Sequence, residues 1–224
     1  MLFRSVIEGT SISISGPARL ESRDISVPGD PSSAAFPAVW AATTPGSKLL
    51  IRNVCINPTR TGFISVLERM GAHILMENIR EKAGEPVGDI VISGERLKAT
   101  VIEGDEIPRL IDEIPILVVA ACLAEGKTII RDAAELRVKE TDRITAMVKG
   151  LSRLGADVCE QDDGMIIEGP VRLHSGSIQT FSDHRIAMSF HILAKASDRD
   201  ITLDDTACVG ISYPDFFASM ESLV

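Results

Sequence analysis

The sequence lacks the features of several common protein classes. No apolar run approaches the ~20 residues that span a bilayer. The formal net charge of −9 argues against nucleic acid or an anionic membrane as a partner, because both need a broad basic face. The four histidines lack the spacing of metal ligands: His73, His174, His184 and His191. We therefore expect no membrane, nucleic-acid or metal partner.

Cysteine is also scarce, and no two cysteines form a close metal-type pair. The chain has four of them: Cys55, Cys122, Cys159 and Cys208. Cys122 lies in an apolar run, which indicates a free thiol in the core. Free thiols are typical of the reducing cytoplasm, so we expect a cytoplasmic protein.

Two motifs of common catalytic sites are missing. There is no Gly-x-Ser-x-Gly turn, which argues against a serine hydrolase. There is also no Gly-x-x-x-x-Gly-Lys-Ser/Thr phosphate loop. Gly126-Lys127-Thr128 mimics the end of such a loop, but Ala121 stands where its first glycine belongs. We expect Lys127 and Thr128 to begin a strand instead.

What the sequence does contain is a repeated layout. Each copy begins with an aspartate followed by an apolar helix rich in small residues, predicted over 30–42, 112–124 and 183–196. A polar turn and a strand-forming run follow, over 45–51, 125–130 and 198–203. With 45% hydrophobic and 25% charged residues, the composition is that of a globular protein.

Each copy continues with a second helix. Gly71 and Gly155 are placed as the glycines that follow helix ends in the first two copies. In the third copy we predict a helix over 214–223, with Pro214 in its first turn. The first two copies then close with a strand pair, and the clearer one turns at Asp163 and Gly164. The pattern predicts an α/β (α+β) fold of repeated βαβαββ units.

A shorter repeat concerns the organisation of the chain. Related segments occur at 14–20, 92–97 and 167–173. The second and third segments end a unit, so we expect residues 1–26 to be the tail of an upstream domain and a crossover. Residues 27–224 would then form one domain of three units: 27–98, 99–173 and 174–224. We accordingly expect the chain to be the C-terminal part of a longer protein.

The densest charged cluster is the run Arg-Val-Lys-Glu-Thr-Asp-Arg at 137–143, where a turn enters a helix. On a helix, Lys139, Glu140 and Arg143 would share one face. Two interpretations stay open from these residues alone. One is a solvated network of ion pairs. The other is an anion site, where backbone N–H groups and the helix dipole add to the cations.

The aspartates that begin the first helices also have two interpretations. Asp is a strong N-cap, worth ~1 kcal/mol, and we expect Asp30 and Asp183 to cap their helices. Asp112 has apolar flanks, so it is either a cap or a partly buried general base with a raised pKa. Beside Asp183, the cation Arg185 opposes the helix dipole, which indicates that it meets an anion.

Taken together, these motifs resemble the C-terminal half of the EPSP synthase (3-phosphoshikimate 1-carboxyvinyltransferase) family. The matching segments occur in the family's order and cover nearly the whole chain: 28–34, 110–115, 137–143, 183–185 and 212–216. The resemblance implies the two-domain enolpyruvyl transferase fold, with three βαβαββ units in each domain. It also implies that the N-terminal half of the same enzyme is a partner, and that the chain alone is inactive.

The resemblance further implies the family reaction of the shikimate pathway, which leads to chorismate and aromatic amino acids. Shikimate 3-phosphate and phosphoenolpyruvate are joined and phosphate is released, with no metal or organic cofactor. By resemblance, Asp112 is the base and Glu140 carries the proton. Lys139 contacts shikimate 3-phosphate, while Arg143 and Arg185 bind phosphoenolpyruvate, for which the guanidinium fork is suited.

Two further residues, His184 and Ile211, bear on the resemblance. His184 is a neighbour of the site with an open role. Ile211 stands where many members of the family carry Lys, which resembles a divergent subgroup that includes glyphosate-insensitive enzymes. The alternatives are a UDP-N-acetylglucosamine enolpyruvyl transferase and a non-catalytic domain of the same fold.

Overall fold

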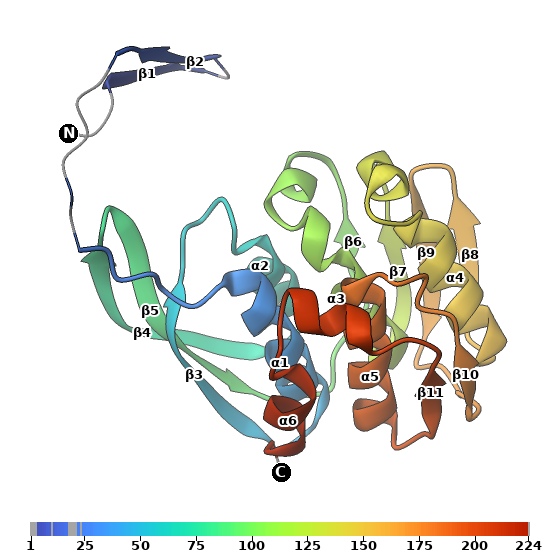
Figure 1. Ribbon diagram of the computed structural model, residues 1–224. Helices are drawn as coiled ribbons and strands as arrows, with labels where there is room; N and C mark the ends of the chain where they lie inside the picture. The colour runs from blue at the N-terminus through green and yellow to red at the C-terminus, as the bar shows by residue number, and fades with distance from the viewer. Residues whose placement is uncertain (1–3, 10, 18–21, 23, 224) are drawn as a thin grey trace.

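Three helices lie at the centre of the computed structural model, which describes residues 4–9, 11–17, 22 and 24–223. They are α1 (Pro31–Thr43), α3 (Ile114–Leu123) and α5 (His184–Ser197), and each packs against the other two (Figure 1). Small side chains such as Ala35 and Ala120, both fully buried, allow close approach of the backbones. The apolar helices predicted in the three copies are confirmed.

The first turns of α1 and α5 show the predicted capping. The Asp30 carboxylate accepts a hydrogen bond from the backbone N–H of Ser33 at 3.0 Å. The Asp183 carboxylate accepts the backbone N–H groups of Arg185 at 2.8 Å and Ile186 at 3.3 Å. Both caps supply partners to N–H groups that the helix itself leaves free.

Asp112 does not cap α3, so that interpretation was wrong. A short 3₁₀ helix, Ile111–Glu113, precedes α3 and shifts its start to Ile114. The residue at the cap position is Glu113, whose side chain makes no capping hydrogen bond. The extra turn leaves the Asp112 carboxylate available for other partners.

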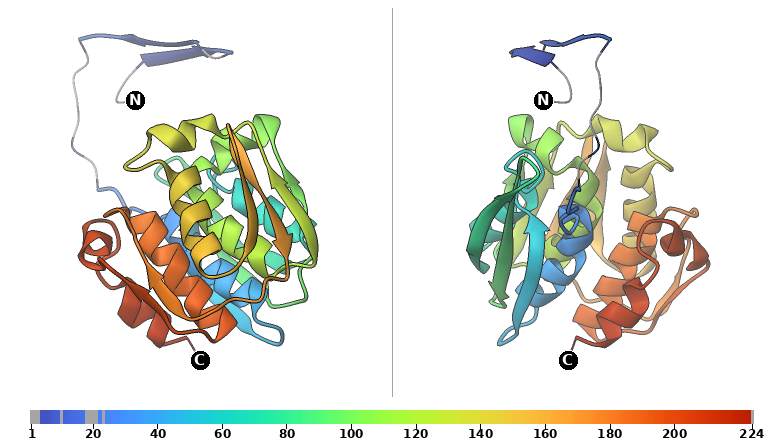
Figure 2. Two further views of the ribbon diagram at one scale, coloured as in Figure 1. Left: turned by 90° about the vertical axis from the view of Figure 1, so that its right-hand side faces the viewer. Right: turned by 60° about the vertical axis from the view of Figure 1, so that its left-hand side comes forward.

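Each inner helix packs on strands of its own copy. α1 contacts a sheet of order β3-β5-β4, α3 contacts a sheet of order β6-β7-β9-β8, and α5 contacts the pair β10-β11. The first sheet is antiparallel throughout. In the second only β6 and β7 are parallel, and β10 and β11 are also parallel. The described part is therefore a mixed α/β domain, as Figure 2 shows from two further sides.

The strand bounds fit the predicted strand-forming runs. The first sheet consists of β3 (Lys48–Cys55), β4 (His73–Lys82) and β5 (Glu85–Ser93). The second consists of β6 (Val101–Ile102), β7 (Gly126–Ile130), β8 (Asp157–Gln161) and β9 (Gly164–Gly169). The remaining pair is β10 (Gly176–Ile178) with β11 (Ile201–Leu203). Lys127 and Thr128 lie on β7, so the strand expected there is confirmed.

The outer helices are α2 (Gly62–Arg69), α4 (Arg143–Arg153) and α6 (Phe216–Glu221). Gly71 and Gly155 follow the ends of α2 and α4 with φ of +104° and +87°, so their predicted place after a helix is confirmed. α6 begins at Phe216, and Pro214 lies in the turn before it. The prediction that Pro214 occupies the first turn was wrong because the helix is shorter than expected.

Glycine is required at position 164 for a different reason from the predicted turn. Gln161 pairs with Gly164, so the turn between β8 and β9 consists of Asp162 and Asp163. A Cβ on Gly164 would lie 1.9 Å from the carbonyl oxygen of Ile130. Glycine is needed there because two strands approach closely, and the turn itself lies one residue earlier than predicted.

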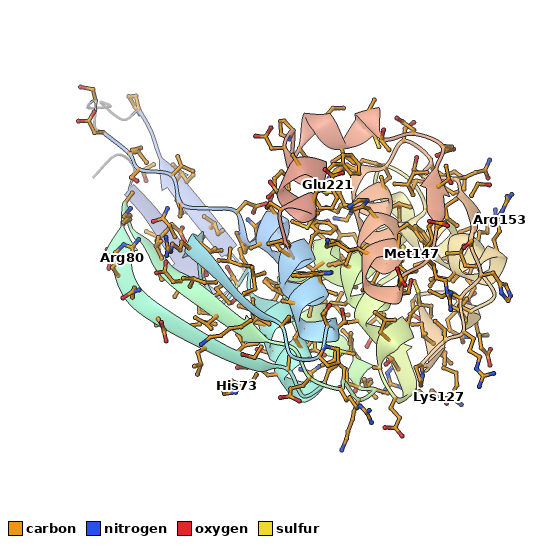
Figure 3. All side chains as sticks on the ribbon, turned by 90° about the horizontal axis from the view of Figure 1, so that it is seen from below. His73, Arg80, Lys127, Met147, Arg153 and Glu221 are labelled. Atoms are coloured by element: carbon orange, nitrogen blue, oxygen red, sulfur yellow. The ribbon has the colours of Figure 1, made fainter. Side chains whose placement is uncertain are left out.

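Side chains divide between one core and a charged exterior. A single hydrophobic cluster extends from Ala34 to Met220. Figure 3 shows charged side chains such as Arg80 and Arg153 at the outside, whereas Met147 on α4 is fully buried. This continuous core unites the three copies and fixes the ends of the inner helices relative to one another.

The hairpin β1 (Arg4–Glu8) and β2 (Ser11–Ser15) stands apart from this core in Figures 1 and 2. It falls within the tail predicted over 1–26. Residues 1–3, 10, 18–21 and 23 of that tail lie outside the described residues. The end of the 14–20 repeat is therefore not described.

Candidate functional site

The charged cluster at 137–143 divides into a structural part and a candidate site. Arg137 and Asp142 pair at 2.8 Å, and Asp142 caps α4 by accepting the N–H of Thr145 at 3.0 Å. Arg137 also donates to the carbonyl oxygens of Gln161 and Asp162, each at 2.6 Å. These contacts fix the start of α4 against the β8–β9 turn.

Lys139 and Glu140 lie in the connection before α4. The helix begins at Arg143, so the predicted helical face shared by all three residues was wrong. The backbone of Lys139 is extended at the end of a 3₁₀ helix, Ala134–Val138. Its ammonium nevertheless reaches the same aspartate as Arg143 does, because both approach Asp112 from the 137–143 segment.

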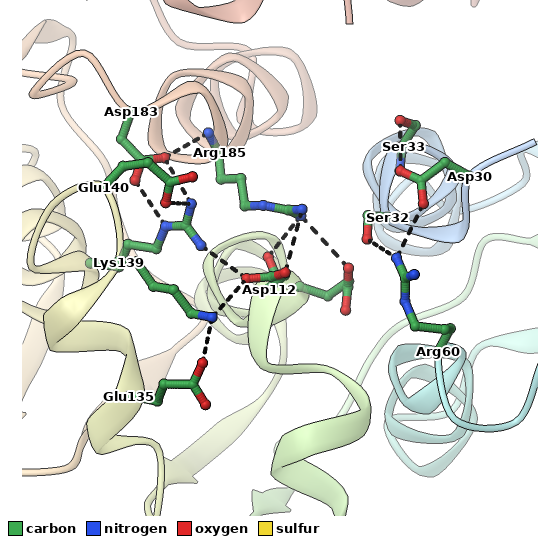
Figure 4. A network of polar contacts seen from close by, with 12 residues as sticks. Asp30, Ser32, Ser33, Arg60, Asp112, Glu135, Lys139, Glu140, Asp183 and Arg185 are labelled. Carbon is green, nitrogen blue, oxygen red and sulfur yellow. Dashed lines mark hydrogen bonds and ion pairs between the residues drawn. The ribbon is translucent and has the colours of Figure 1, made fainter. Parts of the chain in front are cut away.

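Arg143 is the centre of the candidate site and is almost fully buried, with 1% of its side chain exposed. Its guanidinium donates from Nε to Asp183 Oδ2 at 2.9 Å and from Nη1 to Asp112 Oδ1 at 3.2 Å. Nη2 donates to Glu140 Oε2 at 2.6 Å. Figure 4 shows these carboxylates arriving from three parts of the chain. A buried guanidinium is stable only when its donors are satisfied in this way.

Asp112 faces three cations and is partly exposed (39%). Lys139 Nζ lies 3.5 Å from Oδ1, and Arg185 Nη2 lies 3.7 Å from Oδ2. Burial alone would raise the pKa of Asp112, but the positive charges of Arg185, Lys139 and Arg143 outweigh burial and hold its pKa below the ordinary value. The expected rise was therefore wrong, and the carboxylate is ionised at neutral pH.

Lys139 bridges two carboxylates. Its ammonium lies 2.6 Å from Glu135 Oε1 as well as 3.5 Å from Asp112. The hydrogen bond to Glu135 raises the pKa of Lys139, and the charge of Asp112 adds to this. Lys139 is therefore a fixed cation at the edge of the site.

Arg185, a cation in the first turn of α5, lies near two carboxylates, those of Asp112 and Glu113. Nη1 donates to the backbone carbonyl of Asp112 at 3.1 Å and lies 3.7 Å from Glu113 Oε1. Burial lowers the pKa of the neighbouring His184, and the charges of Arg185 and Arg143 lower it further. His184 is therefore mainly neutral at neutral pH, which excludes it as a further fixed cation.

Glu113 belongs to the same network, although the sequence did not identify it as a site residue. Its side chain is 4% exposed, and Oε1 accepts no hydrogen bond from any described residue. Burial raises the pKa of Glu113, while the nearby Ser32 hydroxyl and the charge of Arg185 act against this. The sequence signal that could have identified Glu113 was its position next to Asp112, between apolar residues.

The network continues to the start of α1. Arg60 donates from Nη2 to Ser32 Oγ at 3.2 Å and pairs with Asp30 Oδ1 at 3.3 Å (Figure 4). Contacts of Ser32 and Arg185 with Glu113 connect this group to the Asp112 cluster. The first turns of α1 and α5 and the 3₁₀ turn before α3 therefore meet at one place.

The arrangement suits anion binding and proton transfer. Arginine forks and free N–H groups of helix first turns are donors for carboxylate and phosphate. The fold brings together five residues that the sequence indicated as site residues: Asp112, Lys139, Glu140, Arg143 and Arg185. Ile211 is 89% exposed at the end of a 3₁₀ helix, Ala207–Ile211.

The model of the EPSP synthase (3-phosphoshikimate 1-carboxyvinyltransferase) family matches residues 3–220. The chain belongs to the EPSP synthase family. A 3-phosphoshikimate 1-carboxyvinyltransferase of Geobacter metallireducens is 51% identical over 210 residues, covering 94% of this chain and 49% of that protein. A 3-phosphoshikimate 1-carboxyvinyltransferase of Acaryochloris marina is 51% identical over 213 residues, which cover 95% of this chain and 48% of that protein.

Solved structures agree with this membership. EPSP synthase from Acinetobacter baumannii superimposes with a TM-score of 0.91 at 43% identity, covering 99% of this chain and 52% of that one. The enolpyruvyl transferase NikO from Streptomyces tendae gives a TM-score of 0.72 at 17% identity, covering 99% and 50%, and shares the fold. The chain spans about half the length of the curated EPSP synthase relatives it matches.

Two further observations concern the described residues alone. Within them, no helix has the length and apolar character needed to cross a bilayer. Within the same residues, no group of three or more His, Cys, Asp or Glu side chains is arranged to hold a metal ion.

Proposed function

We propose that this chain forms one wall of the active site of a 3-phosphoshikimate 1-carboxyvinyltransferase. The enzyme transfers the enolpyruvyl group of phosphoenolpyruvate to shikimate 3-phosphate and releases phosphate, in the cytoplasmic shikimate pathway. The observation that carries the proposal is the Asp112 carboxylate, which three cations surround in a chain of this family.

The reaction needs a base for the acceptor hydroxyl and a proton donor for the methylene carbon. Asp112 acts as the base and holds the hydroxyl; the cations that lower its pKa keep it ionised. The positive charge of these cations also makes Asp112 a weaker base. Proton removal therefore relies more on the placement of the carboxylate beside the hydroxyl than on its basicity. Glu140, which is half exposed beside Arg143, carries the proton to the methylene carbon.

The substrates carry phosphate and carboxylate groups, which need cationic donors. Lys139 contacts shikimate 3-phosphate from the exposed edge of the cluster. Arg143 and Arg185 bind phosphoenolpyruvate, because a planar guanidinium forms paired hydrogen bonds with such anions. His184 adjoins both arginines and is given no separate role. The reaction needs no metal or organic cofactor.

The same proposal covers the organisation of the enzyme. The chain corresponds to the C-terminal half, with three βαβαββ-like units at about 27–98, 99–173 and 174–224 after a tail at 1–26. The N-terminal half forms the opposite wall, and the chain alone is inactive because the site must close to exclude water. Ile211, in place of the family's Lys, supports the divergent subgroup.

The test is phosphate release from shikimate 3-phosphate plus phosphoenolpyruvate. The chain is assayed alone and with the N-terminal half of the Geobacter metallireducens relative, which is 51% identical to the chain over 49% of its own length. We expect activity only in the mixture. A folded and associated pair that releases no phosphate would reject the proposal in favour of a non-catalytic domain. Competition by UDP-N-acetylglucosamine for the acceptor site would favour the other enolpyruvyl transferase.

A further inference from the structure

Burial closes Arg143 to an external ligand in this structure. Its three nitrogens make four hydrogen bonds to carboxylates, because Nη2 donates to Asp183 Oδ1 at 3.5 Å as well as to Glu140, and only 1% of the side chain is exposed. An external anion therefore reaches this guanidinium only by replacing one of the three carboxylates. The question is which carboxylate leaves most readily.

Two of the three are held firmly. Asp183 is 0% exposed, and its carboxylate also accepts the first backbone N–H groups of α5. Moving it would uncap the helix and bury unpaired donors. Asp112 is more open, but Lys139 and Arg185 hold it in addition to Arg143.

Of the three carboxylates that Arg143 contacts, Glu140 has the fewest other interactions. Its side chain is 54% exposed and lies in the connection before α4. The bond from Arg143 Nη2 at 2.6 Å is the one hydrogen bond or ion pair that it makes with the described residues. A half-exposed carboxylate returns to water at little cost, whereas the buried guanidinium still needs an anion.

We infer that Glu140 is an internal competitor on Arg143, and that the carboxylate of an incoming ligand replaces it on Nη2. The guanidinium keeps a negative partner throughout, and the Glu140 carboxyl is released beside the bound ligand. The identity of the ligand, phosphoenolpyruvate, rests on the proposed function. The exchange itself rests on the contacts of Arg143.

The test compares the dissociation constant of phosphoenolpyruvate for the 224-residue chain and three variants, by calorimetry. Glu140→Gln removes the charge of the competitor. Glu140→Asp keeps the charge but shortens the side chain by one methylene, which withdraws it from Nη2. Glu168→Gln removes an exposed charge elsewhere, on β9 beside Lys127, and serves as the control for net charge.

We expect both Glu140 variants to bind phosphoenolpyruvate about threefold to tenfold more tightly than the unchanged chain, and Glu168→Gln to bind equally. Tightening by Glu140→Gln but not by Glu140→Asp would indicate long-range charge and reject the exchange. Equal or weaker binding by both variants, or no measurable binding by any protein, would reject it as well.

This outcome is separable from that of the proposed function. Tighter binding in the Glu140 variants, without phosphate release by the reconstituted pair, would support the exchange and reject the reaction. Phosphate release by the pair without tighter binding would do the opposite.

Discussion

The guanidinium of Arg143 and the carboxylate of Asp183 are joined at 2.9 Å, and both side chains are shielded from solvent. This pair connects the first residue of α4 to the N-cap of α5. Arg143 also donates to two other carboxylates, and Asp183 also accepts backbone N–H groups of α5, so both buried groups are fully partnered. The pair therefore supports both the fold and the position of the candidate site.

We expect Asp183→Asn to lower the free energy of unfolding by about 3 kcal/mol, because the buried Arg143 loses a charged partner. Urea denaturation followed by circular dichroism measures this. Asp200→Asn, at an exposed position, is the control and should change stability by less than about 0.5 kcal/mol. Unchanged stability of Asp183→Asn would show that Asp112 and Glu140 suffice for Arg143.

In the reconstituted enzyme, Asp112→Asn should lower turnover by about 10²–10⁴-fold, because the amide cannot accept the hydroxyl proton. The amide still accepts hydrogen bonds, but Lys139, Arg143 and Arg185 lose a charged partner, so the melting temperature should fall and turnover is compared well below the transition. Phosphate release and thermal melting are measured on the same sample. Near-normal turnover would remove Asp112 from the mechanism. Arg143→Ala is a poor substitute, because it would leave three carboxylates without their shared partner.

Glu113→Gln should raise stability at neutral pH and have little effect at acid pH. The folded pKa of Glu113 is raised, so its stabilising effect is complete below the unfolded pKa and is lost as the pH rises through the folded pKa. The amide avoids this loss because it carries no charge. Unfolding free energies at pH 4 and pH 8 provide the measurement. A larger gain at pH 4 than at pH 8 would contradict the direction.

Gly164→Ala should destabilise the chain by about 1–3 kcal/mol, because the new Cβ would clash with the backbone of Ile130. Gly210→Ala is the matched control, since a Cβ there meets no atom within 4 Å. Thermal melting of both variants measures the difference. Equal melting temperatures would show that β7 and β9 separate without cost.

Local chemistry explains which parts of the fold could be predicted. Asp30, Asp183, Gly71 and Gly155 mark helix ends through contacts within a few residues, and the structure confirms all four. The start of α3 could not be predicted in this way. The 3₁₀ turn before it depends on packing against distant parts of the chain, and nothing at Asp112 itself distinguishes a cap from a site residue.

The candidate site was predicted in its members but not in its geometry. Asp112 and Arg185 are 73 residues apart in sequence, so their contact follows from the packing of α3 against α5. The pKa of Asp112 depends on these distant cations, and burial alone gave the wrong direction. Glu113 was missed because its meaning depends on Arg185 and Ser32, which only the folded chain brings near.

The candidate site has an electrostatic consequence. Lys139, Arg143 and Arg185 share contacts with five carboxyl groups, those of Asp112, Glu113, Glu135, Glu140 and Asp183. The carboxyl groups outnumber the cations, so this wall offers no long-range attraction to a multiply charged anion. In the proposed enzyme, this wall therefore selects its ligands through the direction of its N–H donors. In the proposed enzyme, the long-range pull on both substrates must come from cations on the opposite wall.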